Sequence, residues 1–321
     1  MSRRVLLVGT AAVVALACLL VGRSLLVDGP EDRDVFATAL PVVDPEAAAA
    51  VAARDAAPQD RAVLTRLAEV PTAVWLVPEA YDADHVGGRV RELVDLADEQ
   101  DRVALLVVYG IPDRDCSGGY SAGGLDAGSY RQWVGRIADE ADGAAVVLEP
   151  DALASADECA DVDERTDLLG DAVDLLAAGD ATVYVDAGHS DWVAPDRMAE
   201  LLEQVGTDHV RGFSTNVSSY QADVDERRYA EAIRDELPDL HYVIDTGRNG
   251  KGPGAPGDFC NPAGRALGRE PAAGDGALDA WLWIKPPGES DGTCRGGPAA
   301  GTFWVLGALE LAYAAGWDQQ S

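Results

Sequence analysis

Carboxylate side chains follow apolar segments of this sequence at the points where those segments end. The segments, with the acids that follow them, are residues 103–108 with Asp115, 144–148 with Glu149 and Asp151, 182–185 with Asp186, 241–244 with Asp245, and 280–284 with Asp291. If the segments are parallel strands, their C-terminal ends meet on one rim, which is where α/β barrels place catalytic residues. Two carboxyl groups on one rim can serve as general acid and general base, so the pattern predicts acid/base hydrolysis.

Asp151 is the candidate general acid. It comes just past a buried segment, and Asp115 follows the neighbouring one, so the two carboxylates are expected to crowd one site and raise the pKa of one of them. In the alternative interpretation, Asp151 only caps the next helix. Glu149 would point to the opposite side if the strand continues, and we expect it to have a supporting or packing role.

Short segments rich in Val and Ile alternate with helix-like ones along the chain. The short segments are residues 73–77, 103–108, 144–148, 182–185, 210–214, 241–244 and 280–284, and the helix-like ones include 45–55, 86–99, 129–141, 161–178, 194–205 and 225–236. Segments that are apolar on both faces are typical of parallel strands buried on both sides. We therefore predict an α/β fold, a closed or nearly closed distorted barrel with about seven parallel strands. The Gly- and Pro-rich residues 246–276 are expected to form a functional loop held by Cys260.

The first residues predict an exported protein. Arg3 and Arg4 precede an apolar run from Val5 to Gly22, which is typical of a signal peptide or a membrane anchor, and both alternatives stay open for residues 1–27. Residues 28–40 are expected to form a linker, and residues 41–321 a single catalytic domain. In either case the domain faces outward, so it is secreted or lies on the extracellular face of the cell membrane.

Cysteine usage agrees with an exported protein. Apart from Cys18, the sequence has four cysteines, an even number. We expect two disulfides and favour the neighbouring pairs, because each would join loops that follow adjacent strands. Free or metal-bound thiols are the alternative, although no Cys-x-x-Cys spacing is present. The favoured pairs are Cys116 with Cys159 and Cys260 with Cys294.

The charge limits the classes of partner. A formal net charge of −31 argues against binding to nucleic acid or to an anionic membrane surface, so the substrate is expected to be neutral. The four histidines are dispersed and no His-Glu-x-x-His occurs, so neither a metal nor another cofactor is expected. One of only two lysines is Lys285, which we expect to pair with Glu289 or Asp291.

Eight ordered blocks between about Trp75 and Trp304 carry a resemblance to a known family. They include VVYGIPDRDC at residues 107–116, YSAGG at 120–124, LEPDAL at 148–153, YVDAGHSDW at 184–192, NVSSY at 216–220, DTGRNG at 245–250, DFCNP at 258–262 and WIKPPGESDG at 283–292. The chain resembles glycoside hydrolase family 6, the inverting cellulases. That resemblance implies a β-1,4-glucan substrate and hydrolysis with inversion of the anomeric configuration.

The resemblance also implies roles for residues at the cleavage point. Asp151 matches the general acid, and Asp115 matches the aspartate that supports its protonation. Tyr109 matches the tyrosine beneath the distorted sugar ring. Asp291 matches the proposed base, with a water relay near Ser121 as the alternative.

Other matching positions are expected to bind sugar. They are a rim carboxylate, Asp186; polar and aromatic contacts, His189, Trp192, Asn216, Lys285 and Glu289; and an aromatic platform, Trp75. Aromatic rings stack on the apolar faces of pyranose rings, so Trp283 is a further candidate platform, with core packing as its alternative.

In the family that the chain resembles, tunnel-forming cellobiohydrolases have long insertions before the last strand, whereas here the stretch between Cys260 and Trp281 is short. The resemblance therefore favours an open cleft and an endo-β-1,4-glucanase, expected to be a monomer that acts on soluble glucan or amorphous cellulose. A cellobiohydrolase and a non-catalytic glycan-binding protein on the same fold are the alternatives.

Overall fold

The computed structural model describes residues 29–116, 118–159 and 161–317. The expected signal peptide or membrane anchor of residues 1–27 lies outside this part of the chain. Within the described ranges, no helix is both long enough and apolar enough to span a bilayer.

One eight-stranded sheet forms the centre of the protein, in the order β1-β2-β3-β4-β5-β6-β8-β7. The strands are β1 Val74–Leu76, β2 Leu105–Val108, β3 Ala145–Leu148, β4 Thr182–Asp186, β5 Gly212–Thr215, β6 His241–Asp245, β7 Ala272–Ala273 and β8 Leu278–Leu282. All pairs are parallel except β7 with β8. The backbone N–H of Ala73 donates to the carbonyl of Trp283 at 3.0 Å, which links the segment before β1 to the segment after β8. The predicted α/β fold with seven parallel strands in a distorted barrel is confirmed, whereas β7 was not predicted.

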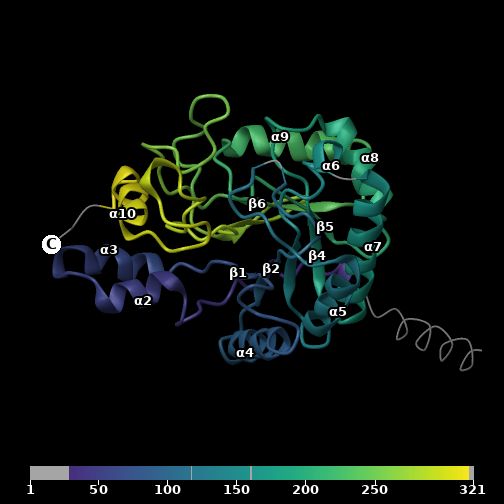
Figure 1. Cartoon of the computed structure of the whole chain (residues 1–321), viewed down its shortest axis with the longest axis horizontal. Helices are drawn as coiled ribbons and strands as arrows, with labels where there is room; N and C mark the ends of the chain where they lie inside the picture. The colour runs from purple at the N-terminus through teal and green to yellow at the C-terminus, as the bar shows by residue number, and fades with distance from the viewer. Residues whose placement is uncertain (1–28, 117, 160, 318–321) are drawn as a thin grey trace, which may run out of the picture.

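Helices cover the outside of this sheet (Figure 1). They are α4 Val86–Glu99, α5 Ala127–Ala138, α6 Ala156–Cys159, α7 Val162–Ala178, α8 Pro195–Val205 and α9 Asp223–Arg234. Two of them begin at side-chain caps. Asp126 accepts hydrogen bonds from the backbone of Gly128 and Ser129 at the start of α5, and Asp161 caps α7 in the same way.

The strands are buried on both faces. Leu106 and Val108 of β2 pack outward in the cluster between sheet and helices, whereas Leu105 and Val107 pack into the barrel interior. This explains why the strand segments are almost uninterrupted apolar runs. The register pairs Val108 with Leu148 and Leu148 with Val185, so the residues that follow these strands meet at one level.

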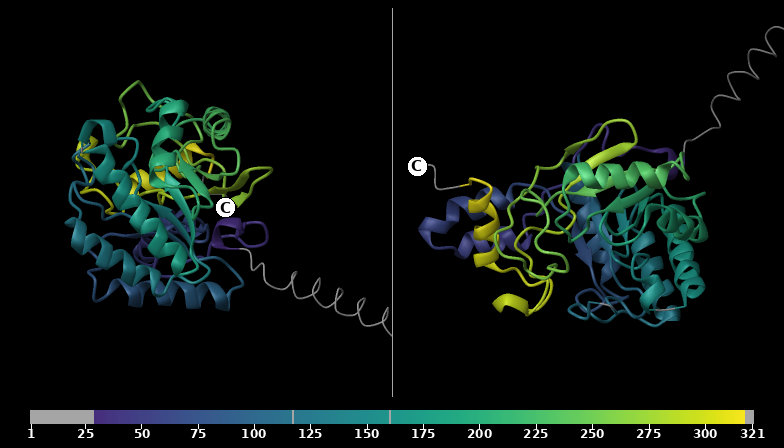
Figure 2. Two further views of the ribbon diagram at one scale, coloured as in Figure 1. Left: turned by 90° about the vertical axis from the view of Figure 1, so that its right-hand side faces the viewer. Right: turned by 90° about the horizontal axis from the view of Figure 1, so that it is seen from above.

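Three further helices lie at one end of the barrel, although they come from opposite ends of the chain (Figures 1 and 2). They are α2 Ala48–Asp55, α3 Pro58–Ala68 and α10 Val305–Ala314. Leu64 and Leu67 of α3 pack with Leu309 of α10 and with Trp283 in a separate apolar cluster. Helix α3 was not predicted.

The described part of the expected linker, residues 29–40, packs against the barrel. It begins with a short 3-10 helix, η1 Pro30–Asp32. Phe36 is only 1% exposed and its ring centroid lies 6.2 Å from that of Tyr184 on β4. Arg33 forms a bidentate ion pair with Asp180, the residue that precedes β4 by two positions.

Candidate active site

A groove of about 1460 Å³ runs across the C-terminal ends of the strands. Most residues that the sequence nominated line it: Asp115, Asp151 and Asp291, together with Trp75, Tyr109, Ser121, His189, Trp192, Lys285 and Glu289. The groove therefore gathers the three catalytic candidates and several aromatic side chains that lie far apart in the sequence. Among the described residues, no group of three or more His, Cys, Asp or Glu side chains could hold a metal ion.

Asp151 lies just past β3 with a left-handed backbone, at a φ of 70°. Its side chain is half-buried in the groove. Burial raises the pKa of the Asp151 carboxyl well above its ordinary value, and the negative charges of Asp186 and then Asp115 raise it further. A carboxyl group in this environment keeps its proton near neutral pH, which is the requirement for a general acid.

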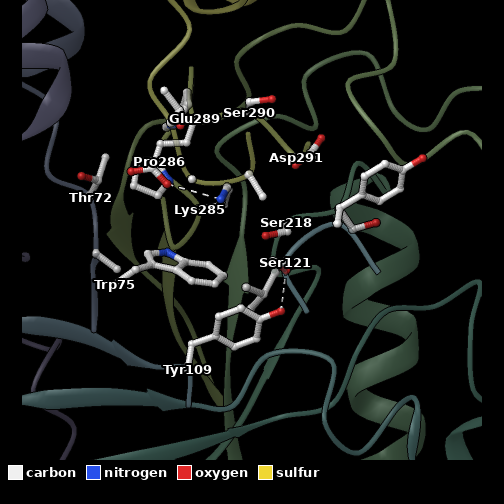
Figure 3. Close-up of a pocket in the computed structure, with 18 of the residues that line it drawn as sticks. Thr72, Trp75, Tyr109, Ser121, Ser218, Lys285, Pro286, Glu289, Ser290 and Asp291 are labelled. Atoms are coloured by element: carbon white, nitrogen blue, oxygen red, sulfur yellow. Dashed lines mark hydrogen bonds and ion pairs between the residues drawn. The ribbon is translucent and has the colours of Figure 1, made fainter. Parts of the chain in front are cut away.

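Asp115 and Ser121 form one hydrogen-bonded unit beside the acid. Oδ2 of Asp115 accepts the backbone N–H of Ser121 at 2.5 Å and its hydroxyl at 3.0 Å. The Ser121 hydroxyl also lies 3.1 Å from the Tyr109 hydroxyl. Figure 3 marks this contact with a dashed line. Burial raises the pKa of Tyr109, with a further contribution from the Asp151 charge, so its hydroxyl stays neutral.

Arg114 holds this unit in place, a role that the sequence did not reveal. Its guanidinium donates to the carbonyls of Ser121 at 2.9 Å and Tyr109 at 2.8 Å. It also pairs with Glu79 at 3.0 Å, and it lies 4.7 Å above the Tyr109 ring. Arg114 is buried, so these contacts hold the loop after β2 from inside the protein.

Asp291 lines the groove from the segment after β8 and accepts three hydrogen bonds. Arg248 donates to Oδ1 at 2.8 Å, while the Tyr220 hydroxyl and the backbone of Asn261 donate to Oδ2 at 3.1 and 2.9 Å. A carboxylate has about four acceptor positions, so one remains for a water molecule. Arg248, which is 4% exposed, was also not predicted. The only sequence signal was its place in the DTGRNG block.

Trp75, Lys285 and Glu289 lie together in one wall of the groove (Figure 3). Nε1 of Trp75 donates to the carbonyl of Ile284 at 2.8 Å, which fixes the indole. Nζ of Lys285 lies 4.7 Å above the Trp75 ring and 3.3 Å from Glu289. The expected pairing of Lys285 with an acid is therefore present, and its partner is Glu289.

His189 and Trp192 line the groove on the loop after β4, with ring centroids 5.5 Å apart. The backbone N–H of Asp191 donates to Nδ1 of His189 at 3.2 Å. Burial lowers the pKa of His189 to about 4, so the ring is neutral at neutral pH. With Nδ1 acting as acceptor, the proton of the neutral ring is on Nε2, which is then a hydrogen-bond donor.

Two predicted sugar contacts are wrong because their side chains bond inside the protein. Asp186 is 1% exposed and accepts the backbone N–H groups of Asp151 and Gly188, so it is not a rim carboxylate. Asn216 is fully buried, and its amide donates to the carbonyls of Asp245 and Gln221. Both residues shape the rim without reaching the groove.

The prediction of Trp283 as a sugar platform is also wrong, and its alternative, core packing, is what the structure has. Trp283 is 0% exposed and its Nε1 donates to the carbonyl of Arg269 at 2.7 Å. Its ring lies 6.3 Å from that of Trp317, under α3 and α10. Ala280, Leu282 and Ile284 pack into the barrel interior, so the alternation of side chains turns Trp283 outward, away from the groove.

Glu149 has the supporting role expected of it. It is 0% exposed, and its two carboxylate oxygens accept the N–H of Gly110 at 2.9 and 3.1 Å. Burial raises the pKa of Glu149 to about 7. Asp245, at the end of β6, is buried in the same way and accepts the N–H of Lys285 at 2.9 Å.

The two predicted disulfides are present. Cys116 is bonded to Cys159, with 5.8 Å between the Cα atoms, and Cys260 is bonded to Cys294, with 6.2 Å. The first follows Asp115 directly and joins the loop after β2 to α6. The second holds the long loop after β6 next to the segment that carries Asp291.

Comparison with known proteins gives consistent matches. The model of the family described as Glycosyl hydrolases family 6 matches residues 35–315. The chain is 43% identical over 278 residues to Endoglucanase A of Cellulomonas fimi, which covers 86% of this chain and 61% of that protein. The match to Endoglucanase A of Thermobispora bispora, at 37% identity, also spans 61% of the relative, so this chain covers less than two thirds of the length of both.

Solved structures agree with these matches. The endoglucanase Cel6 of Mycobacterium tuberculosis, in complex with methyl-cellobiosyl-4-deoxy-4-thio-β-D-cellobioside, is 45% identical with a TM-score of 0.84, covering 88% of this chain and 100% of that one. The catalytic core domain of the cellobiohydrolase Cel6A of Chaetomium thermophilum is 26% identical with a TM-score of 0.76, covering 88% and 98%.

Proposed function

We propose that this chain, which belongs to glycosyl hydrolases family 6, is an endo-β-1,4-glucanase that hydrolyses cellulose-type glucan with inversion. The observation that carries the proposal is a groove in which the half-buried Asp151 shares one cavity with Asp115 and Asp291. The relatives named endoglucanase and the thio-oligosaccharide bound by the M. tuberculosis enzyme support the choice of substrate.

Asp151 acts as general acid in this proposal. It donates its proton to the glycosidic oxygen as the bond to the leaving sugar breaks. Burial, together with the charges of Asp186 and Asp115, favours the protonated form before the reaction. The mutually exclusive roles of acid and base require one carboxyl that is protonated and one that is not.

Asp291 acts as general base. Its carboxylate is held by an ion pair with Arg248, and its remaining acceptor position can take the hydrogen bond of the attacking water. The alternative is a water relay through Ser121, whose hydroxyl bonds both Asp115 and Tyr109. Loss of the Asp291 carboxylate would then cost little activity, whereas loss of the Ser121 hydroxyl would cost much.

The rings that line the groove and the identities to relatives favour an endo mode of attack over the cellobiohydrolase alternative. Two rings that line the groove, those of Tyr120 and Phe259, meet edge to face with centroids 6.1 Å apart. They remain 43% and 56% exposed. The chain is 43% identical to an endoglucanase but 26% identical to a cellobiohydrolase core domain, so we infer a cleft that admits the interior of a chain. The two disulfides, which persist in oxidising compartments, support action outside the cell.

Carboxymethylcellulose and cellopentaose test the proposal together. An endo-glucanase lowers the viscosity of carboxymethylcellulose after few new reducing ends have formed, and an inverting enzyme releases the α-anomer first, which proton NMR detects. A steady release of cellobiose with little loss of viscosity would favour the cellobiohydrolase. Binding without cleavage would favour the non-catalytic glycan-binding protein, and the β-anomer as first product would exclude inversion.

A further inference from the structure

The groove does not end at Trp75. The cavity that contains Asp151 continues to the end of the barrel formed by α2, α3 and α10. Figure 3 shows Trp75 and Thr72 on the side of the pocket away from Asp291 and Ser121. Beyond Thr72 the same cavity is lined mainly by small apolar side chains: Ala48, Val51 and Ala52 of α2, Val70 after α3, and Val305 at the start of α10.

This end of the groove differs in chemistry from the cleavage point. Its acids are engaged elsewhere, since Asp44 pairs with Arg89 and Glu46 pairs with Arg54. Val51 and Val305 are 40% and 37% exposed and are among the few large apolar side chains that face solvent in the described chain. Apolar side chains exposed together in a groove mark a place where a ligand covers them.

We propose that this apolar end of the groove binds glucosyl units beyond the one that lies on Trp75. The inference rests on the proposed function. A chain held across Asp151 and Trp75 has to continue into this part of the same cavity, and the C–H faces of pyranose rings are apolar. Valine and alanine side chains give contact without fixed hydrogen bonds, so the site adds affinity for long chains and tolerates sliding.

The inference predicts a preference for long oligosaccharides that depends on two valines. Val51→Ala with Val305→Ala removes part of the apolar contact and should lower the ratio of kcat/KM on cellohexaose to that on cellotetraose by about 3- to 10-fold. Val51→Trp supplies a stacking surface and should raise the ratio. Val224→Ala on α9 is the matched control, because Val224 is 62% exposed and lies outside the groove. All these positions are exposed, so the variants are expected to fold.

The position of cleavage gives an independent measurement. Cellohexaose labelled with ¹⁸O at its reducing end shows by mass spectrometry which bond is cut. In the double variant, the cleaved bond should shift so that fewer glucosyl units lie between it and the chain end on the Trp75 side. The ¹⁸O label marks the reducing-end fragment, so it shows which end of the chain lies on that side. If the ratio and the cut are unchanged in all variants while cellotetraose is still cleaved, the inference is overturned. If the unaltered protein cleaves neither oligosaccharide, the proposed function itself is wrong, and the inference with it.

Discussion

The buried carboxylate of Asp186 accepts the backbone N–H of Asp151 at 2.9 Å. The same carboxylate accepts the N–H of Gly188 and the hydroxyl of Ser214, both at 3.0 Å. Asp186 thereby holds the strand end that carries the acid and, when it is ionised, places a buried negative charge close to it. Among the charged neighbours of Asp151 it contributes more to the raised pKa than Asp115 does, and burial contributes more than either.

The basic limb of the pH profile should therefore move when these charges are removed. Activity requires protonated Asp151, and a neighbouring negative charge raises its pKa, so Asp115→Ala and Asp186→Asn should each shift the loss of activity to lower pH. The shift should be larger for Asp186→Asn. The test is kcat/KM against pH on a soluble glucan, with urea unfolding as the control for folding. Profiles that coincide with that of the unaltered enzyme would remove both residues from this role.

Stability should fall as pH rises through the mildly acidic range. Burial raises the pKa of Glu149 and of Asp186 to about 7, so the folded state binds more protons than the unfolded chain between about pH 4 and 7. The free energy of unfolding then decreases with rising pH in that window. Glu149→Gln, which keeps an acceptor for Gly110, should make this decrease smaller. Urea titrations at several pH values measure it, and stability that increased across the window would contradict the assignment.

Two tryptophans should separate binding from stability. Trp283→Phe leaves a cavity in the core and removes one of the two hydrogen bonds to the Arg269 carbonyl, which still accepts the Thr246 hydroxyl. It should therefore cost about 2 to 4 kcal/mol of unfolding free energy with little change in KM. Trp75→Ala should raise KM because it removes a groove wall. Chemical unfolding and steady-state kinetics on both variants make the comparison. A large rise in KM for Trp283→Phe in a fully folded protein would restore it as a sugar contact.

The disulfide beside Asp115 should stabilise both the fold and the site. Cys116 and Cys159 are 43 residues apart, which corresponds to about 4 kcal/mol in the chain-entropy account. Replacing both by serine should lower the unfolding free energy by up to that amount. It should also reduce kcat, because Asp115 and Ser121 lie on the loop that the bond holds. A variant as active and as stable as the parent would contradict this prediction and would show that the contacts of Arg114 hold the loop without the disulfide.

Much of the framework follows from the sequence because burial on both faces leaves a clear mark. All seven parallel strands were predicted close to their observed positions, and so were the positions of Asp115, Asp151 and Asp291 at the rim. The sequence could not distinguish a carboxylate that faces the groove from one that turns into the protein interior. Asp186 follows its strand as Asp151 does, yet it is almost completely buried.

Other misassignments come from contacts between distant segments. Trp283 is buried because α3 and α10 meet over it, and α3 was not predicted. Arg114 and Arg248 were not predicted because nothing in a sequence indicates which arginine turns inward to hold backbone carbonyls or a carboxylate. Their positions depend on the left-handed turns of the rim, where Asp115, Asp151 and Ser218 have φ between 52° and 70°.

The role of Asp151 is tested most directly by measuring how the loss of kcat in Asp151→Ala depends on the leaving group of the substrate. If Asp151 protonates the departing oxygen, the substitution should lower kcat by about 10²- to 10⁴-fold on cellopentaose, whose leaving group needs a proton. On 2,4-dinitrophenyl β-cellobioside, whose leaving group departs without one, the loss should be far smaller. An equal loss on both substrates, in a variant that still folds and binds cello-oligosaccharide, would contradict the assignment of Asp151 as the acid.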